Sequence, residues 1–188
     1  MEFRLTYRGS LRANGNVDEK QRLRAWFHPQ LRTLWQQRPL NLLTTEGNSV
    51  LDPPPGRDTS VLQRVGPSWF APLITSQPRL IGSLDILMLR PEPPGAIILR
   101  GGDIDNRLKT LLDALRMPHT PDELPGGWVQ QPDENPFFCL LEDDALITSI
   151  AVASDRLLEE RPPAEVELVI RVVVKATEPT WANMALAI

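Results

Sequence analysis

The sequence predicts an α/β (α+β) fold, in which a mixed β-sheet is packed by two main helices. Three observations lead to this prediction. Side chains alternate as in a strand near the amino terminus, apolar residues recur at helical spacing in two segments, and each of the two helical segments is followed by further strand-like segments. The expected strands are residues 2–8, 80–90, 147–155 and 165–175, and the expected helices are 18–37 and 104–116. A chain of 188 residues with 41% hydrophobic content is long enough to form one core.

The first and last of these strands show the alternation most clearly. In residues 2–8, polar and apolar side chains alternate with a period of two, which places Arg4 and Arg8 on an outer, basic face. In residues 165–175 one face is apolar throughout and is expected to be buried. Its members are Val166, Leu168, Ile170, Val172 and Val174.

The first helix is expected to be interrupted near its middle. Pro29 cannot donate a backbone hydrogen bond, so it is predicted to start a second helical segment that is capped near His28. The polar side of this helix is expected to carry Arg22 and Arg24. Both would then be accessible to an anionic partner.

Three segments do not fit the regular pattern and are predicted to be additions to a core formed by residues 1–38 and 80–175. The first insertion, residues 41–78, is expected to be largely irregular, with an extended stretch around 61–64. The second, residues 117–136, holds five prolines and two adjacent glycines, so an exposed loop is expected. An apolar tail follows at 178–188, and all these segments are assigned to a single domain, 1–188.

Several classes of protein are improbable on composition. Cys139 is the only cysteine and lies in an apolar run, and His28 and His119 are the only histidines, which argues against a zinc finger or a Cys/His nucleophile. The first residues are interrupted by charges, unlike a signal peptide, and no apolar run reaches the length of a membrane span. The protein is therefore expected to be cytoplasmic, with no membrane partner.

Charge is distributed unevenly along the chain. Residues 1–40 hold eight Lys and Arg against three Asp and Glu, whereas residues 101–188 hold seven against sixteen. A basic surface beside an acidic, cation-binding one is what a polyanion-cleaving enzyme needs. On charge alone, two solvated faces are the simpler interpretation.

The segment GGDIDNRLKTLLDAL carries the first group of candidate functional residues. Asp105, Lys109 and Asp113 follow one another at i, i+4 spacing along one edge of the helix. Asp103 is expected to precede the helix proper and to turn back toward Asp105, which would give two oxygen ligands from one short segment. The apolar stripe beside this edge should face the sheet, and it is formed by Ile104, Leu108, Leu111, Leu112 and Leu115.

A second acidic group follows thirty residues later. Glu142, Asp143 and Asp144 come directly after an apolar run, and adjacent carboxylates repel one another unless they are solvated or share a cation. Mg²⁺ is the expected cation because it prefers hard oxygen ligands, keeps several waters and needs only one or two protein carboxylates together with phosphate oxygens. Mn²⁺ is a possible substitute, and two ions would lie about 3.5 to 4 Å apart.

Each of these residues also has a purely structural interpretation. Asp103 or Asp105 would serve as a helix N-cap, and Lys109 would form an ion pair with Asp105 or Asp113 on an exposed face. The Glu142–Asp144 run would open a turn after its strand. The combination of both groups in one chain favours a shared site.

Together, the two groups resemble a known family. Asp-x-Asp-Asn, a lysine and Asp-Ala-Leu on one helix, followed by a loop and Glu-Asp-Asp before a strand, is similar to the RusA family of Holliday junction resolvases. The resemblance covers roughly residues 80–175. The matching positions are Asp103, Asp105, Asn106, Lys109, Asp113, Glu142, Asp143 and Asp144, and Asn14 matches an asparagine that the family carries early in the chain.

The resemblance implies a site, an activity and an assembly. It implies that Asp103, Asp105 and Asp144 are the essential metal-binding acids, with Asp143 as a supporting metal-site carboxylate and Lys109 as the catalytic lysine near the scissile phosphate. Asn106, Asp113 and Glu142 would support them. The implied protein is a homodimeric, Mg²⁺-dependent endonuclease of branched DNA, and DNA contacts are expected from Arg4, Arg8, Asn14, Arg22 and Arg24.

The chain departs from the family in charge and length. It is acidic overall and carries the two additional segments. These departures leave the identity of the substrate open, whereas the expected chemistry is unchanged. One alternative is a catalytically inactive or repurposed RusA-like module that binds nucleic acid or protein, for example in phage defence. Another is a nuclease with the same site that acts on RNA. The complete set of acids favours an active nuclease, since a binding module has no need of convergent carboxylates near phosphates.

Overall fold

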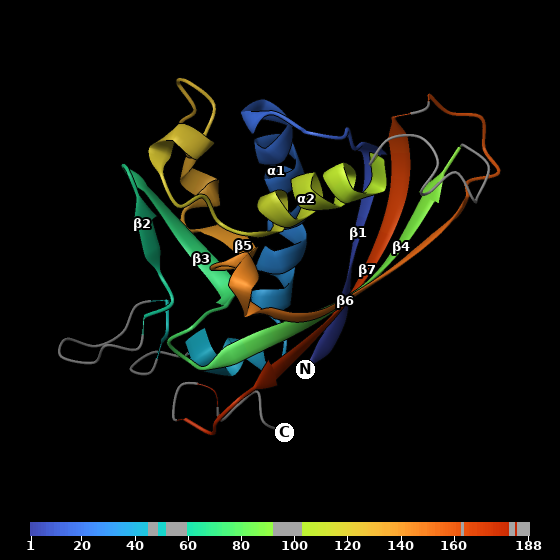
Figure 1. Ribbon diagram of the computed structural model, residues 1–188. Helices are drawn as coiled ribbons and strands as arrows, with labels where there is room; N and C mark the ends of the chain where they lie inside the picture. The colour runs from blue at the N-terminus through green and yellow to red at the C-terminus, as the bar shows by residue number, and fades with distance from the viewer. Residues whose placement is uncertain (45–48, 52–59, 92–102, 163, 181–182, 184–188) are drawn as a thin grey trace.

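The computed structural model describes residues 1–44, 49–51, 60–91, 103–162, 164–180 and 183 (Figure 1). The strands are β1 (Glu2–Ser10), β2 (Gln63–Val65), β3 (Ser68–Ile74), β4 (Leu80–Arg90), β5 (Phe137–Leu141), β6 (Ile147–Arg156) and β7 (Glu165–Ala176). The two α-helices are α1 (Val17–Trp35) and α2 (Asp103–Leu115). Short 3₁₀ helices are η1 (Leu40–Thr44), η2 (Pro121–Glu123), η3 (Pro132–Glu134) and η4 (Asp144–Leu146). The predicted α+β class, with two main helices and mixed sheets, is confirmed.

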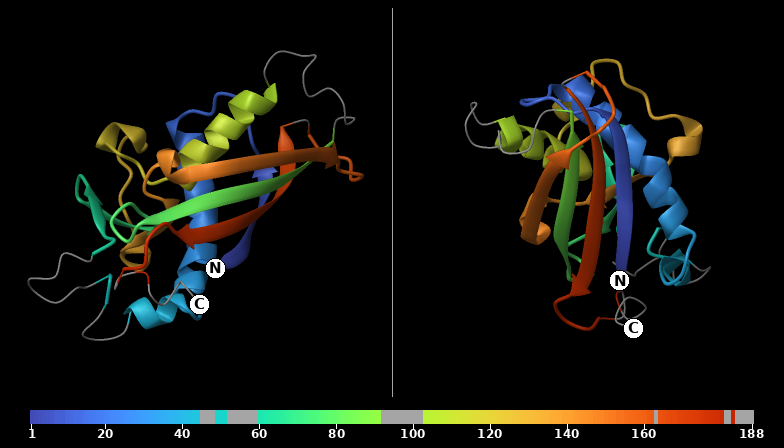
Figure 2. Two further views of the ribbon diagram at one scale, coloured as in Figure 1. Left: turned by 60° about the horizontal axis from the view of Figure 1, so that its bottom comes forward. Right: turned by 90° about the vertical axis from the view of Figure 1, so that its right-hand side faces the viewer.

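The larger sheet has the strand order β1-β7-β4-β6. β7 pairs antiparallel with both β1 and β4, whereas β4 and β6 are parallel. The alternation predicted for β7 is confirmed, because its five inward residues, Val166 to Val174 at every second position, are at most 3% exposed. Figures 1 and 2 show α1 and α2 on one face of this sheet, and the other face is open.

A second sheet, with the order β2-β3-β5, was not predicted. β3 pairs in parallel with β5, and Phe70 of β3 lies opposite Phe137 of β5, both fully buried. The expectation that residues 41–78 form an irregular insertion is therefore wrong for residues 63–65 and 68–74. β3 is stabilised as a strand by its pairing with β5, which lies far away in the sequence, and local periodicity does not reveal such a pairing.

The first helix is continuous, so the expected break at Pro29 is wrong. α1 begins after Asn16, whose side chain accepts a hydrogen bond from the Glu19 N–H, and runs through Pro29 to Trp35. A proline inside a helix deprives the carbonyl four residues earlier of its donor. Here both Pro29 and Ala25 are exposed, and water can therefore satisfy that carbonyl.

The remaining predictions on secondary structure have mixed outcomes. Residues 117–136 are irregular apart from η2 and η3, as expected. The two glycines that open the segment GGDIDNRLKTLLDAL lie outside the described residues. α2 begins at Asp103, one residue earlier than expected, so Asp103 belongs to the helix instead of preceding it. No helix in the described part of the chain is both long and apolar enough to cross a membrane.

Candidate functional site

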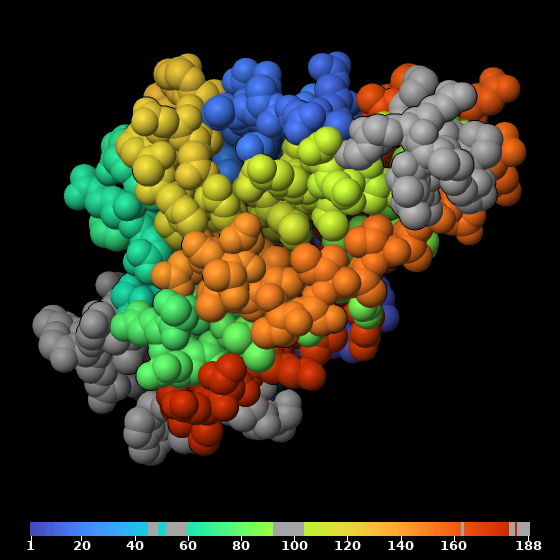
Figure 3. Space-filling view, in the orientation of Figure 1, coloured from blue at the N-terminus to red at the C-terminus, as the bar shows by residue number. Residues whose placement is uncertain are grey.

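The helix α2 presents one edge to solvent and buries the other. Ile104, Leu111 and Leu115 are at most 8% exposed, and Leu108 and Leu112 pack against the same core, which confirms the predicted stripe. Asp105 and Lys109 are exposed. Figure 3 shows α2 (yellow-green) at the surface, between the chain leading into α1 (blue) and the segment of η4 and β6 (orange).

Asp105 does not have the alternative role of a helix cap. It is the third residue of α2, whereas an N-cap precedes the first helical residue. Within the described part of the chain, neither Asp105 nor Lys109 forms an ion pair. The interpretation of Lys109 as a partner of Asp105 or Asp113 is therefore wrong for this conformation.

Asp113, on the same edge, forms ion pairs with two basic side chains of the protein. Its Oδ2 lies 2.7 Å from Lys20 Nζ on α1, and its Oδ1 lies 3.8 Å from Arg116 Nε. The Asp113 side chain is 15% exposed, so its charge is balanced largely by these two partners. Asp113 therefore supports the packing of α2 on α1.

Glu142 and Asp143 are also held by the protein. Glu142 Oε2 accepts hydrogen bonds from the Ser76 N–H at 2.7 Å and from the Ser76 hydroxyl at 2.9 Å. Asp143 caps η4 by accepting from the Ala145 N–H at 2.8 Å, and this hydrogen bond lowers the pKa of Asp143 below its ordinary value. The turn expected after the apolar run is thus present, and Asp143 is its N-cap.

Asp144 differs from its two neighbours. Its side chain is exposed, and no Lys, Arg or His of the described chain forms an ion pair with it. It is the first residue of η4, which lies near the carboxyl end of α2 (Figures 1 and 2), where the Met117 N–H donates to the Leu141 carbonyl oxygen. Asp105 belongs to the first turn of α2, at the other end of the helix. In the described part of the chain, Asp105, Lys109 and Asp144 are thus exposed and form no ion pair, but Asp105 and Asp144 do not lie together.

The described residues alone do not complete a metal site. No group of three or more His, Cys, Asp or Glu side chains in the described part of the chain is close enough to hold a metal ion. The side chain of Asp103, the third expected ligand, lies outside that part. Asp105 and Asp144 are exposed and could each accept a hard cation, but the described structure does not bring them together on one ion.

Arg24 does not lie on the polar side of α1, and its expected role in DNA binding is wrong. It is 2% exposed, and its guanidinium donates to the carbonyl oxygens of Asp113 at 2.8 Å, Arg116 at 3.0 Å and Glu123 at 3.3 Å. These carbonyls lie at the carboxyl end of α2 and just beyond it, where helical oxygens lack partners. Burial lowers the pKa of Arg24, yet the group keeps its donors for these three oxygens.

The other expected basic residues lie apart from one another. Arg4 pairs with Glu2, and Arg8 pairs with Glu159 and Glu167, all on the open face of the sheet, away from α2. Arg22 is on α1, where it donates to the Ser10 carbonyl. The single basic surface expected from Arg4, Arg8, Arg22 and Arg24 is therefore not formed, because the sheet separates the strand arginines from α2.

Asn14 lies near α2, in the turn between β1 and α1. Its φ of 55° is left-handed, a conformation that asparagine tolerates better than most residues. The N–H of the next residue, Gly15, donates to Thr110 Oγ1 on α2 at 2.9 Å. A Cβ at position 15 would lie 2.5 Å from Thr110 Cγ2, so glycine is required for this close approach.

Sequence reasoning gave no role to His119 or Lys20. His119 Nε2 lies 3.4 Å from Asp143 Oδ2 and 3.2 Å from the Glu142 carbonyl oxygen. In the sequence, His119 is notable only for its position early in the loop after α2. That position does not reveal that the loop contacts the Glu142–Asp144 segment. Cys139, in contrast, is fully buried in β5, and burial raises its pKa to about 12, which disfavours a nucleophilic thiolate.

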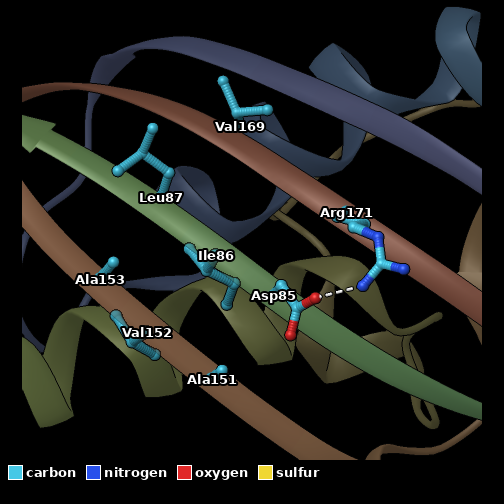
Figure 4. Close-up of a pocket in the computed structure, with 8 residues that line it drawn as sticks. All are labelled: Asp85, Ile86, Leu87, Ala151, Val152, Ala153, Val169 and Arg171. Carbon is cyan, nitrogen blue, oxygen red and sulfur yellow. Dashed lines mark hydrogen bonds and ion pairs between the residues drawn. The ribbon is translucent and has the colours of Figure 1, made fainter.

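A shallow groove crosses the open face of the larger sheet, on the side opposite to α2 (Figure 4). Leu87, Ala151, Ala153 and Val169 line it, and Arg171 forms an ion pair with Asp85 at one end. Arg171 also pairs with Glu2, so its charge is already balanced. The groove contains none of the candidate metal ligands.

No family model, curated protein or solved structure matches this chain. Chemically, an exposed carboxylate and a lysine one helical turn away, as in Asp105 and Lys109 of α2, can bind a hard cation and stabilise the charge of a phosphate, whereas the paired acids cannot do so without losing their present partners.

Proposed function

We propose that this protein is a Mg²⁺-dependent endonuclease that hydrolyses phosphodiester bonds in DNA, with branched structures such as Holliday junctions as its substrate. One observation carries the proposal. Among the described acids of the two motifs, Asp113, Glu142 and Asp143 are held by other parts of the protein, whereas Asp105 and Asp144 have no ion pair. Asp105 and Lys109 lie one helical turn apart on the exposed edge of α2, where both are accessible to a phosphodiester and its cation.

In this proposal the cation would be held by Asp103 and Asp105, the closely spaced acids at the start of α2, with Asp144 as the third ligand that the sequence resemblance implies. When bound, Mg²⁺ supplies a water of lowered pKa and positive charge near the phosphate. Lys109 neutralises charge that develops on the phosphate oxygens in the transition state. Asn14, whose neighbour Gly15 contacts Thr110 of α2, and Arg22, on the exposed side of α1, would position the DNA backbone, a contact that carries no sequence information.

The proposal is tested by incubating the protein with labelled four-way junction, duplex and single-stranded DNA, and with RNA, in Mg²⁺ or Mn²⁺ and in chelator. We expect metal-dependent cleavage, with the junction as the preferred substrate. Cleavage of RNA alone would favour the alternative nuclease. Binding of DNA without cleavage in either metal would favour the inactive module.

Lys109→Ala is expected to abolish cleavage while junction affinity changes little. The lysine acts on charge that develops in the transition state, whereas binding depends on the other phosphate contacts. Single-turnover cleavage and a gel-shift titration at one salt concentration measure the two effects separately. Wild-type cleavage by this variant would show that Lys109 is only a solvated residue of the helix surface.

We also propose that the protein is a homodimer, with the open sheet face as the contact between the two copies. Leu87 is 38% exposed there and is surrounded by small and branched apolar side chains. Leu87→Glu should therefore convert a dimer into a monomer in light-scattering measurements, because it would bury a charge in the contact. Leu158→Glu is the control, since Leu158 is 90% exposed and lies outside the groove. An unchanged mass for Leu87→Glu would contradict this assignment.

A further inference from the structure

His28 joins helix α1 to strand β5 through one buried hydrogen bond. The histidine is 6% exposed, and its Nδ1 accepts the Phe138 N–H at 2.9 Å. Its ring also packs on the rings of Phe137 and Phe138, with centroids 4.4 Å and 5.7 Å away. The two hydrogen-bonded residues are 110 positions apart in the sequence, so this bond holds the helix and the strand together.

The hydrogen bond fixes the protonation state of the ring. An accepting Nδ1 carries no hydrogen, so the imidazole is neutral and its hydrogen is on Nε2. Nε2 is buried and has no hydrogen-bond partner among the described residues. Protonation would place a hydrogen on Nδ1, opposite the Phe138 N–H. A charged ring would therefore face a donor on one side and no acceptor on the other, which is costly for a buried cation.

The charged groups around the ring do not compensate for this loss. Burial has the largest effect and lowers the pKa of His28 below its ordinary value. Glu134 and Asp133 of η3 act in the opposite direction, whereas Arg32 of α1 lowers the pKa further. Glu134 Oε2 accepts from the Gln131 N–H, and Arg32 Nη1 donates to the Asp133 carbonyl oxygen, so these groups have other partners.

The remaining titratable groups nearby give no negative charge either. In β5 the titratable side chain is Cys139, whose pKa burial raises to about 12, so the thiol is neutral. On α1, the buried Arg24 lies one helical turn before His28 and on the same face. Protonation of His28 would add a second positive charge to that face. The contact between α1 and β5 thus requires the neutral ring.

We propose that His28 is an acid-sensitive lock: its protonation releases the start of β5 and the preceding loop, residues 128–136, from α1, at a higher pH than the larger sheet unfolds. The loop is included because its other attachments lie beside this bond. Arg32 binds the Asp133 carbonyl, and the Trp128 ring packs on Phe137 at 6.0 Å. The lock does not depend on the proposed nuclease activity, and its test requires neither metal nor DNA.

The direction of the pH effect follows from the neutral native ring. An opened chain takes up a proton on His28 at the ordinary histidine pKa of about 6.5, whereas the closed native state takes it up only at lower pH. The stabilisation is therefore complete above about pH 6.5 and is lost as the pH falls below it. From about pH 7.5 to about pH 5.5, the equilibrium constant for opening should rise about tenfold, the effect of one proton taken up by the open state alone.

The lock is tested by nuclear magnetic resonance on the wild-type protein. The imidazole signals of His28 should report less than half protonation at about pH 6.5. Amide hydrogen exchange, corrected for its intrinsic pH dependence, measures opening at single residues. Protection of the Phe138 N–H should fall about tenfold between the two pH values, whereas Ile170, fully buried in β7, should keep its protection.

Two variants remove the titrating ring in different ways. His28→Asn keeps an oxygen that can accept the Phe138 N–H, and His28→Phe keeps an aromatic ring but no acceptor. Neither takes up a proton in this pH range, so both should lose the tenfold change in Phe138 protection, whatever their overall stability. His119→Asn is the matched control, because His119 is the other histidine and is exposed, and it should keep the wild-type change.

Three results would overturn the lock. A native His28 that is half protonated at about pH 6.5, with Phe138 protection unchanged, would show that the charged ring is accommodated. A wild-type pH effect in His28→Asn would assign the proton uptake to another group. Equal loss of protection at Phe138 and Ile170 would mean that acid unfolds the whole molecule and releases no separate part.

Discussion

Replacing Asp105 or Asp144 by Asn is expected to reduce metal-dependent cleavage by about 100-fold or more, because each change removes a charged ligand from the cation. Stability should not fall in parallel. Neither carboxylate forms an ion pair in the described structure, so each variant should melt in chelator at the wild-type temperature or above it. In wild type, millimolar Mg²⁺ or Mn²⁺ should raise the melting temperature by mass action, and this increase should shrink in both variants.

Asp113→Asn provides the matched control on the same edge of α2. Asp113 is paired with Lys20 and Arg116, so this variant should lose roughly 1–3 kcal/mol of stability while its response to metal remains. Denaturant unfolding and the cleavage assay separate the two patterns. Full activity in both Asp105→Asn and Asp144→Asn would show that these acids are only solvated surface residues.

Arg24→Met is expected to have the largest effect on stability, roughly 3–5 kcal/mol of the free energy of unfolding. The guanidinium donates to three carbonyl oxygens at the end of α2 and in the following loop, and each would lose a buried donor at a cost of about 1–3 kcal/mol. Methionine keeps most of the apolar stem, so the change isolates the hydrogen bonds. Urea unfolding followed by circular dichroism measures the difference.

Arg22→Met is the control for the same helix, because the Arg22 side chain is 57% exposed and, unlike Arg24, donates to none of the carbonyl oxygens at the end of α2. Its effect should stay within about 0.5 kcal/mol. An Arg24→Met protein as stable as Arg22→Met would mean that water satisfies the three carbonyls equally well. The buried guanidinium would then contribute no more to stability than an exposed one.

The candidate site could be predicted from the sequence only as a set of residue types. The two acidic groups and the lysine were identified by their spacing, but their spacing does not show which of the acids have partners. Asp113 and Asp105 lie on the same edge of one helix, and their difference comes from Lys20, which is far away along the chain. Glu142 and Asp143 are likewise held by Ser76 and His119, from other segments.

The sequence by itself determined the elements whose cause is local. β4, β7 and α2 were predicted almost to their ends, because side-chain alternation and the helical stripe are set by neighbours a few residues away. The tertiary structure alone decided the second sheet, the continuity of α1 through Pro29, and the burial of Arg24. Arg24 shares the sequence character of an exposed helix arginine, but its hydrogen bond to Asp113 joins residues 89 positions apart. Contacts across such separations depend on how the elements pack, and periodicity along the chain carries no record of that packing.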